Sequence, residues 1–430
     1  MRSRHRRRRR IRNMKKRIAI LSRGMKYLAQ LTVRRFSPTI VAVTGSVGKT
    51  STKEAIYAVL SGHMRVRKSP GNLNNELGVP LAIIGGYQRI ETPALWFWLR
   101  VIAHALWQLA FARKDAFPEV LVLEYAADKP GDISYLLSIA KPHVGVISAI
   151  GSVPVHAEQY PTGTEGVIRE KGKLVFALGA GDTAVVNADD VSVKTLLSKI
   201  RARTIVFGQS HGSAVRITHI SHTMKGDKIE GLVFKLETAS TSLPVFLPHV
   251  FSVAHASAVA AGVCVGEAFD INAIDALQAI EASYAPIGGR SAILEGMKDT
   301  QIIDESYNSS PLALETALQS LTSVYGPRKI AVLGDMLELG PYTIQAHKDA
   351  GALAARCVDV LITVGNRARI MAQEALDKGM SENAVHVCET ARDGLEILQK
   401  VFRKGDVILI KGSHSIGLES VVQEMTKVGK

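Results

Sequence analysis

The chain has 430 residues, of which 53 are Lys or Arg and 39 are Asp or Glu, and its formal net charge is +14. This length predicts two or three domains with ample chain for a buried core. A hydrophobic fraction of 47% with 21% charged residues excludes a disordered chain, a collagen-like chain and a polytopic membrane protein. The three cysteines (Cys264, Cys357 and Cys388) are far apart in sequence, which argues against a disulfide framework or zinc site and favours a reducing, cytoplasmic location.

The positive charge is concentrated in an N-terminal tail. Residues 1–35 contain 15 Lys and Arg and no Asp or Glu, whereas the other 395 residues hold 38 basic and 39 acidic side chains. The like-charge block from Arg2 to Arg12 is expected to be disordered, and the apolar spacing after it predicts a basic amphipathic helix within a tail over residues 1–38. A helix packed on the body and contact with anionic lipid stay open as alternatives. Nucleic acid binding is disfavoured, because only the arginine block supports it.

After the tail, apolar runs typical of strands alternate with helical segments. The first series predicts a mostly parallel sheet covered on both faces, with strands at 39–43, 120–123, 143–147, 183–186 and 204–207. Residues 214–247 alternate more strongly, which predicts antiparallel strands at a sheet edge. A second series predicts strands at 302–303, 329–333, 360–364, 384–387 and 407–410. We therefore expect an α/β fold with a P-loop-type central domain over 39–285 and a Rossmann-like C-terminal domain over 286–430.

An apolar insert at about residues 92–113 interrupts the first series. Residues 94–111 are apolar except for Arg100, His104 and Gln108, which form one polar stripe at helical spacing, and all three tryptophans of the chain lie here. Eighteen residues barely span a bilayer, and a charge near the middle argues against a span. An amphipathic helix in a membrane interface fits better. A helix that covers the body or joins a dimer is the alternative.

A glycine turn between the first strand and a helix is the strongest chemical signal. It reads Thr44-Gly-Ser-Val-Gly-Lys-Thr-Ser51, and such a turn binds phosphate with backbone N–H groups and a helix N-terminus. Lys49 would reach the β- and γ-phosphates, and Thr50 would offer a hydroxyl to Mg²⁺. The loop is shorter than the common pattern. The predicted nucleotide-binding residues here are Gly45, Ser46, Val47, Gly48, Lys49, Thr50 and Ser51.

From about Thr39 to Val422 the sequence resembles the Mur ligases, and most of all their MurF type. Five stretches carry this resemblance beside the loop, namely those at 71–80 (Gly-Asn-Leu-Asn-Asn), 124–133 (Glu-Tyr-Ala-Ala-Asp), 304–311 (Asp-Glu-Ser-Tyr-Asn), 332–340 (Val-Leu-Gly-Asp-Met) and 411–419 (Lys-Gly-Ser-His-Ser). The resemblance implies an ADP-forming ligase of cell-wall precursor synthesis. Such an enzyme uses ATP to convert a carboxylate into an acyl phosphate, which an amino acid or dipeptide, such as D-alanyl-D-alanine, then attacks.

The resemblance also implies roles for single residues in the central domain. Glu124, at the carboxyl end of a strand, and His156 would be Mg²⁺ ligands with Thr50, since hard oxygen ligands and His suit this ion. Lys171 would be carbamylated and supply a further anionic oxygen. Lys49, His156 and Lys171 are thus the predicted catalytic residues. Further predicted nucleotide-binding or substrate-lining residues are Asn75, His255, Arg290, Asp304 or Glu305 (at the ribose), Asn308, Asp335, Glu338, Lys411 and Ser413.

Three departures from the family pattern affect the expected substrate. MurF-type enzymes begin with a further domain that holds the UDP-sugar. We expect this domain to be missing here, because the phosphate loop starts at Thr44. Ser310 and His414 stand where Asn and Arg are usual, and the adenine-side stretch has His255. Three functions stay open: a ligase acting on a muramoyl peptide, a related ligase with a different and membrane-associated acceptor, and a non-catalytic ATP-binding scaffold. We expect a cytoplasmic protein that makes peripheral contact with the inner membrane surface. The sequence does not predict its oligomeric state.

Overall fold

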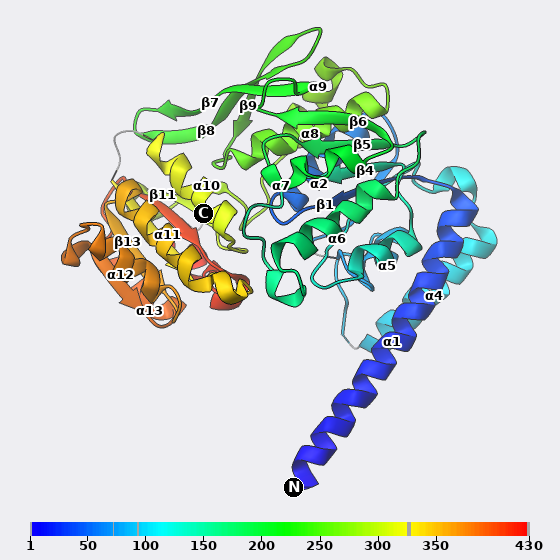
Figure 1. Cartoon of the computed structure of the whole chain (residues 1–430), viewed down its shortest axis with the longest axis horizontal. Helices are drawn as coiled ribbons and strands as arrows, with labels where there is room; N and C mark the ends of the chain where they lie inside the picture. The colour runs from blue at the N-terminus through cyan, green and yellow to red at the C-terminus, as the bar shows by residue number, and fades with distance from the viewer. Residues whose placement is uncertain (1, 72, 93, 325–327, 428–430) are drawn as a thin grey trace.

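Two β-sheets lie side by side in the computed structural model, which describes residues 2–71, 73–92, 94–324 and 328–427, with side chains from Ile18 onward (Figure 1). Asn72, within the first of the five stretches above, is therefore outside the described residues. The first sheet has nine strands and the second has six. The boundary predicted between residues 285 and 286 falls between helix α9 (Ala273–Ser283) and strand β10 (Ala292–Glu295), the first strand of the second sheet.

The first sheet is parallel from β2 to β7 and antiparallel from β7 to β9. Its spatial order is β2 (Val66–Lys68), β3 (Val120–Glu124), β1 (Thr39–Thr44), β4 (Val144–Ile147), β5 (Thr183–Asn187), β6 (Arg203–Gly208), β7 (Val215–Lys225), β8 (Lys228–Glu237) and β9 (Ser242–Pro248). Strands β3, β4 and β5 are buried at every residue because helices cover both faces. Strand β9 alternates between exposed and buried residues, as a strand with one solvent face does.

Helices cover both faces of this sheet. One core joins it to α2 (Lys49–Ser61), α8 (Ala254–Ala268) and α9. On the other face lie the end of α1 (Arg2–Phe36), α3 (Gly78–Ile84), α5 (Asp132–Ile139) and α6 (Thr164–Phe176), while the short α7 (Val191–Lys194) follows β5. Helix α1 begins at Arg2, so it includes the block for which the sequence predicts disorder. Arginine favours helix intrinsically, and the helix extends outward from a docked C-terminal part.

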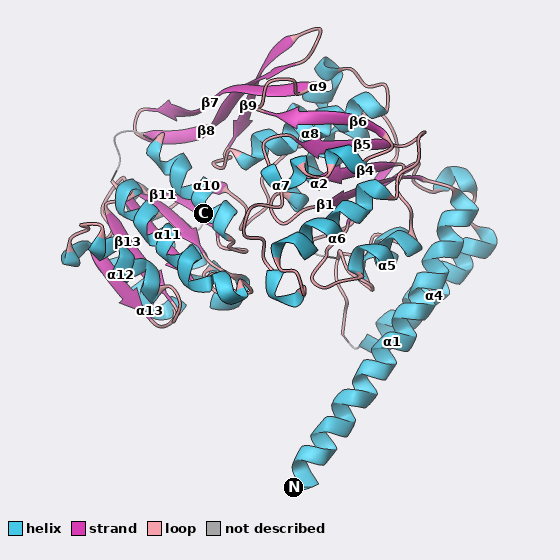
Figure 2. Cartoon of the chain, in the orientation of Figure 1, coloured by secondary structure: helices cyan, strands magenta, loops and turns pink. Residues whose placement is uncertain are grey.

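The second sheet is parallel apart from its first strand. Its order is β10, β11 (Gln301–Glu305), β15 (Val407–Lys411), β12 (Lys329–Gly334), β13 (Val360–Val364) and β14 (Val385–Cys388), with β10 antiparallel to β11. Helices α10 (Pro311–Thr322), α11 (Thr343–Cys357) and α12 (Arg369–Asp377) pack on one face, and α13 (Ala391–Val401) and α14 (Glu419–Met425) pack on the other. Figure 2 shows this alternation of helix and strand in both units. The predicted fold class is confirmed, and the short edge strands β2 and β10 are the two that the sequence did not reveal.

The carboxyl ends of both sheets supply the polar residues of one pocket. Glu124 is the last residue of β3 and lies in register with Val43 of β1, directly before the glycine turn. In the second sheet, Glu305 ends β11 and is the register partner of Lys411, the last residue of β15. Ligands of open parallel sheets bind at this edge. The topology therefore brings two such edges together around one site.

Candidate active site

The turn between β1 and α2 is fixed by the loop that follows β4. The backbone N–H groups of Ser46 and Val47 both donate to the carbonyl of Ala149, and the hydroxyl of Ser148 donates to the carbonyl of Val47. Gly48 has a φ of +80° and starts α2. Only glycine adopts this left-handed backbone without strain. The turn is thus held rigid against β4 with the N-terminus of α2 open toward the pocket.

A buried carboxylate lies beside the first turn of α2. The hydroxyl of Thr50 donates to Oε2 of Glu124 over 2.9 Å, and the amide of Asn74 donates to Oε1 over 3.0 Å. Burial by itself would raise the pKa of Glu124, but the charges of Lys49 and Lys53 and the hydrogen bond from Asn74 hold it below its usual value. Glu124 therefore stays ionised. A hydroxyl and a carboxylate oxygen at hydrogen-bond distance are a donor set that suits Mg²⁺.

Two lysines face the same cavity from different elements. Lys49 is half-buried at the start of α2, and desolvation lowers its pKa. The negative charge of Glu124 opposes this shift, whereas the positive charge of Arg290 adds to it. Lys171 is buried on α6, and its Nζ donates to the carbonyl of Gly45 over 3.0 Å. Desolvation, with the charge of Lys49, lowers the pKa of Lys171 to about 7 from its ordinary 10.5. Both lysines thus line the pocket, and the Lys171 amine is partly neutral at neutral pH.

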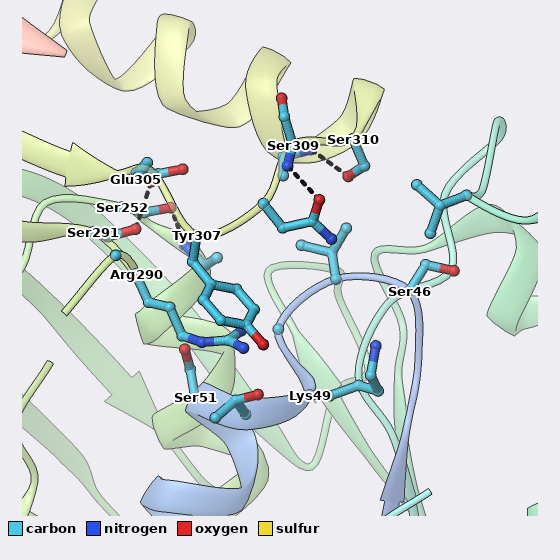
Figure 3. A pocket seen from close by; sticks show the side chains of 18 of the residues that line it. Ser46, Lys49, Ser51, Ser252, Arg290, Ser291, Glu305, Tyr307, Ser309 and Ser310 are labelled. Atoms are coloured by element: carbon cyan, nitrogen blue, oxygen red, sulfur yellow. Dashed lines mark hydrogen bonds between the residues drawn. The ribbon is translucent and has the colours of Figure 1, made fainter. Parts of the chain in front are cut away.

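The C-terminal unit contributes an arginine and a buried ion pair. The guanidinium of Arg290 lies 4.1 Å from the ring centroid of Tyr307, a cation–π geometry that fixes its direction (Figure 3). Nζ of Lys411 is 2.6 Å from Oε2 of Glu305 and also donates to the carbonyl of Asn308 over 3.0 Å. Glu305 and Lys411 are both buried. The side of the pocket opposite Lys49 is therefore also preformed.

These groups enclose one cavity of about 300 Å³ between the two sheets. Its lining includes the predicted residues Ser46, Val47, Gly48, Lys49, Thr50, Ser51, Glu124, His156, Lys171, His255, Arg290, Glu305, Asn308 and Lys411. Among the described residues, only four buried side-chain polar atoms lack a hydrogen-bond partner, and two of them, the hydroxyls of Ser46 and Ser309, belong to this lining. A bound polyanion would supply these hydroxyls with acceptors.

His255 is a structural part of the lining. Its Nδ1 is 2.6 Å from the hydroxyl of Tyr284, and its Nε2 is 3.2 Å from the carbonyl of Arg290. Burial lowers its pKa to about 4, so the ring is neutral at neutral pH. The ring thus links the start of α8 to the segment that carries Arg290. A role at the adenine stays a prediction.

His156 bridges the two halves of the structure at the rim. Its Nε2 lies 3.3 Å from a carboxylate oxygen of Asp128, and its Nδ1 lies 3.3 Å from a carboxylate oxygen of Glu338. Within the part of the chain that the structure describes, no group of three or more His, Cys, Asp or Glu side chains forms a metal-binding cluster. A cation at Thr50 and Glu124 would consequently draw its remaining ligands from phosphate oxygens, water or a modified Lys171.

Several predicted residues are not in the cavity lining, and most of their side chains hold loops in place instead. Asn75 accepts hydrogen bonds from the backbone of Leu77 and Gly78, and its neighbour Asn74 reaches the cavity instead. Asp304 accepts from the backbone of Gly289, so of the two adjacent acids only Glu305 lines the cavity. The carbonyl of Gly45 binds Lys171, and Glu338 contacts His156. Asp335 accepts hydrogen bonds from the backbone of Arg367 and Ala368, and Ser413 accepts one from the backbone of Leu337.

Half of the 28 lining residues are not among the predicted site residues, and four of these have polar groups that bear directly on the site. Tyr307 supports Arg290, Asn74 supports Glu124, Asp128 contacts His156, and Ser309 has the free hydroxyl. All four lie inside the stretches that resemble the Mur ligases. The resemblance thus gave the right segments, whereas the direction of each side chain depended on the fold.

Two family models match the chain. The model described as "Mur ligase middle domain" matches residues 43–91 and 104–262, and that described as "Mur ligase, glutamate ligase domain" matches residues 289–414. Together they account for most of the chain. The chain belongs to the Mur ligase family. It is accordingly an enzyme, an ATP-dependent ligase that forms amide bonds.

Individual relatives place this Mur ligase near one branch of the family. It is 27% identical to a UDP-N-acetylmuramoyl-tripeptide–D-alanyl-D-alanine ligase of Bacillus subtilis, over 94% of this chain and 79% of that protein. The ligase of the same name from Escherichia coli is 28% identical over 91% of this chain and 77% of its own length. The crystal structure of MurF ligase from Thermotoga maritima in complex with ADP is similar with a TM-score of 0.75 and 25% identity, and the match covers 94% of this chain and 82% of that one.

A substitution in the glycine turn tests whether its shape holds the nucleotide. Gly45 has a φ of +154°, and a Cβ built there would lie 2.1 Å from the hydroxyl of Ser148. Gly45→Ala should therefore displace the turn and weaken ATP binding at least about tenfold, measured by calorimetric titration. The matched control is Gly181→Ala, since a Cβ at Gly181 meets no atom within 4 Å. Equal ATP affinity for the Gly45→Ala variant and the wild-type enzyme would show that the turn does not need this geometry.

Proposed function

We propose that this Mur ligase joins D-alanyl-D-alanine to the terminal carboxylate of a UDP-N-acetylmuramoyl-tripeptide. The observation that carries the proposal is the cavity that Lys49 lines from the central unit and Arg290 lines from the C-terminal unit, beside ionised Glu124. The curated relatives above have this reaction in their names. The charges that line the cavity and the names of the relatives therefore both support an ATP-dependent ligase reaction.

The reaction follows from the need for a leaving group. A carboxylate oxygen attacks the γ-phosphorus of ATP, the bond to the β–γ bridging oxygen breaks, and an acyl phosphate and ADP form. The amine of the second substrate then attacks the acyl carbon, phosphate leaves, and the amine loses a proton. Lys49 and Arg290 stabilise the charge that moves onto the phosphate oxygens. Mg²⁺, which Thr50 and Glu124 would hold, supplies further charge neutralisation.

Removing the loop lysine tests the assigned site. Lys49→Ala should lower kcat by about a hundredfold to a thousandfold, because a cation at the transferring phosphate is lost. Steady-state release of ADP, coupled to a dehydrogenase assay, measures the effect. The control is Lys194→Ala, an exposed lysine on α7 away from the cavity. Turnover of the Lys49→Ala variant at the wild-type rate would refute the site.

The substrate pair is tested by product analysis. With ATP, Mg²⁺, the muramoyl tripeptide and D-alanyl-D-alanine, mass spectrometry should find the joined product together with equal amounts of ADP and phosphate. A panel of other acidic acceptors and amino acids runs in parallel. A product formed only from another pair would keep the ligase chemistry and overturn this substrate assignment.

We further propose that Lys171 is carbamylated. Its neutral amine can attack CO2 to give a carbamate with loss of a proton, and this requires the deprotonated form. Because the folded pKa is about 7, well below the ordinary value, the amine is available above about pH 7 and is protonated below it. A carbamate would place an anionic oxygen among Lys49 and the phosphates, where an ammonium group would be repelled by a cation.

Activity should therefore depend on bicarbonate and on pH together. Enzyme depleted of CO2 should regain activity on addition of bicarbonate above about pH 7 and regain little below it. Lys171→Ala should lose activity that formate or acetate partly restores, whereas Lys173→Ala, on the same helix and paired with Glu170, should not respond to either additive. Full activity of the Lys171→Ala variant without additives would contradict the modification.

A further inference from the structure

Helix α4 (Ala94–Phe111) is attached to the body by one face. Phe97, Val101 and Ala105 are buried on this face, and they share a core with Met25 of α1 and with residues of α3. Tyr87 packs edge-to-face on Phe97. The three helices thus form one packed layer beside the first sheet.

The opposite side of α4 is apolar and exposed. Trp96 is 70% exposed, Trp107 is 57% exposed, and Phe111 at the C-terminal end is 73% exposed. Leu95, Leu99 and Leu106 are also exposed and complete what we name the α4 apolar face, consisting of Leu95, Trp96, Leu99, Leu106, Trp107 and Phe111. Contiguous apolar surface of this kind marks an interaction site.

The polar stripe of α4 does not face bulk water as it would in an ordinary surface helix. Gln108 is buried, and its Oε1 lacks a partner among the described residues. His104 bonds the hydroxyl of Tyr87 over 2.8 Å. Only Arg100 is exposed, and it pairs with Glu91 over 2.7 Å at the margin. Two of the three polar side chains of α4, His104 and Gln108, are therefore turned toward the body, and the exposed side of the helix is mostly apolar.

Positive charge lies next to the α4 apolar face. Helix α1 packs along α4 and extends beyond it, away from both sheets (Figure 1). Residues 1–35 hold 15 Lys and Arg and no acid. On the described part of α1, Arg23 and Arg34 are exposed, as are Ile20 and Tyr27. The family models leave residues 1–42 and 92–103 unmatched, so α1 and the first part of α4 lie outside the common pattern, whereas Leu106, Trp107 and Phe111 lie within it.

We propose that α1 and α4 dock this enzyme on an anionic membrane surface, with α4 lying flat and its apolar face in the interface. Aromatic side chains prefer the headgroup region, and basic residues near it are attracted by anionic lipid. A second copy of the chain would cover the same face, but it would bring two acid-free basic helices together. Charge complementarity therefore favours lipid over a second copy.

A transmembrane arrangement of α4 is a poorer fit. Among the described residues, α4 is the one helix with the length and composition of a membrane span, at a mean hydropathy of 1.3. However, spanning would remove Phe97, Val101 and Ala105 from their core with α1 and α3. It would also place Arg100 within the hydrocarbon. The docked, flat position keeps this core intact and leaves Arg100 at the margin.

The tryptophans provide a direct test, because all three (Trp96, Trp98 and Trp107) lie on α4. The full-length protein is titrated with phosphatidylcholine vesicles that either contain or lack phosphatidylglycerol. With the anionic vesicles we expect a blue shift of the tryptophan emission and quenching by lipids brominated near the headgroups. The Trp98→Phe variant should keep both signals. The double variant Trp96→Phe with Trp107→Phe should lose most of them, since Trp98 is half-buried against the body.

Binding variants separate the apolar and charged contributions. In vesicle sedimentation, Trp96→Ser with Trp107→Ser should weaken binding at least about tenfold, and so should deletion of residues 2–17. The control is Val191→Ser, which removes an exposed apolar residue on α7. Unchanged ATP binding checks that each variant is folded, since none of these residues lines the cavity.

Three outcomes would overturn the proposal. The first is no emission shift and no sedimentation with anionic vesicles. The second is equal binding to neutral vesicles, or quenching that is strongest from the bilayer centre. The third is a dimer in analytical ultracentrifugation that the serine double variant converts to monomer while vesicles change nothing, which would assign the α4 apolar face to a second copy.

Discussion

A buried carboxylate among three lysines is the constraint on which the site depends. Glu124 accepts hydrogen bonds from Thr50 and Asn74, and Lys49, Lys53 and Lys171 lie near enough for their charges to interact with it. Glu54 lies 3.4 Å from Lys53 and offsets part of this charge, and the positive charge of Lys49 and Arg290 faces the cavity. A triphosphate with its metal ion would balance this positive charge. The site is thus suited to a polyanionic ligand, since burial lowers the pKa of Lys49 and Lys171 and an anion beside them would favour their charged forms.

The two sheets cooperate because each presents its carboxyl edge to the same cavity. The first sheet supplies the phosphate turn and Glu124, and the second supplies Glu305 and Lys411, with Arg290 directed by Tyr307. A cation from each unit, Lys49 and Arg290, therefore lines the cavity that we propose for the phosphates. His156, between Asp128 and Glu338, adds a contact across the same boundary. A polyanion bound in this cavity would consequently contact charged groups of both units.

The sequence predicted the segments of the site better than the directions of its side chains. The glycine turn and the strand-end position of Glu124 have local signatures, so both were accessible. Asn75 and Asn74 are adjacent in a loop, as Asp304 and Glu305 are adjacent in β11, and only the fold decides which member of each pair lines the cavity. The polar stripe of α4 was also recognised, but not its position against the body, because a polar stripe ordinarily faces water. Nothing in the local sequence of α4 indicates that part of its polar stripe faces the body instead of water.

In the proposed reaction, the enzyme transfers a phosphoryl group from ATP to a carboxylate within this cavity. This transfer is tested most directly with a peptide substrate whose terminal carboxylate carries oxygen-18. The released phosphate is then analysed by mass spectrometry. If an acyl phosphate forms, one labelled oxygen atom passes from the carboxylate to each phosphate. If amide is formed while the released phosphate carries no label, the carboxylate was not activated by phosphorylation and this account of the site is wrong.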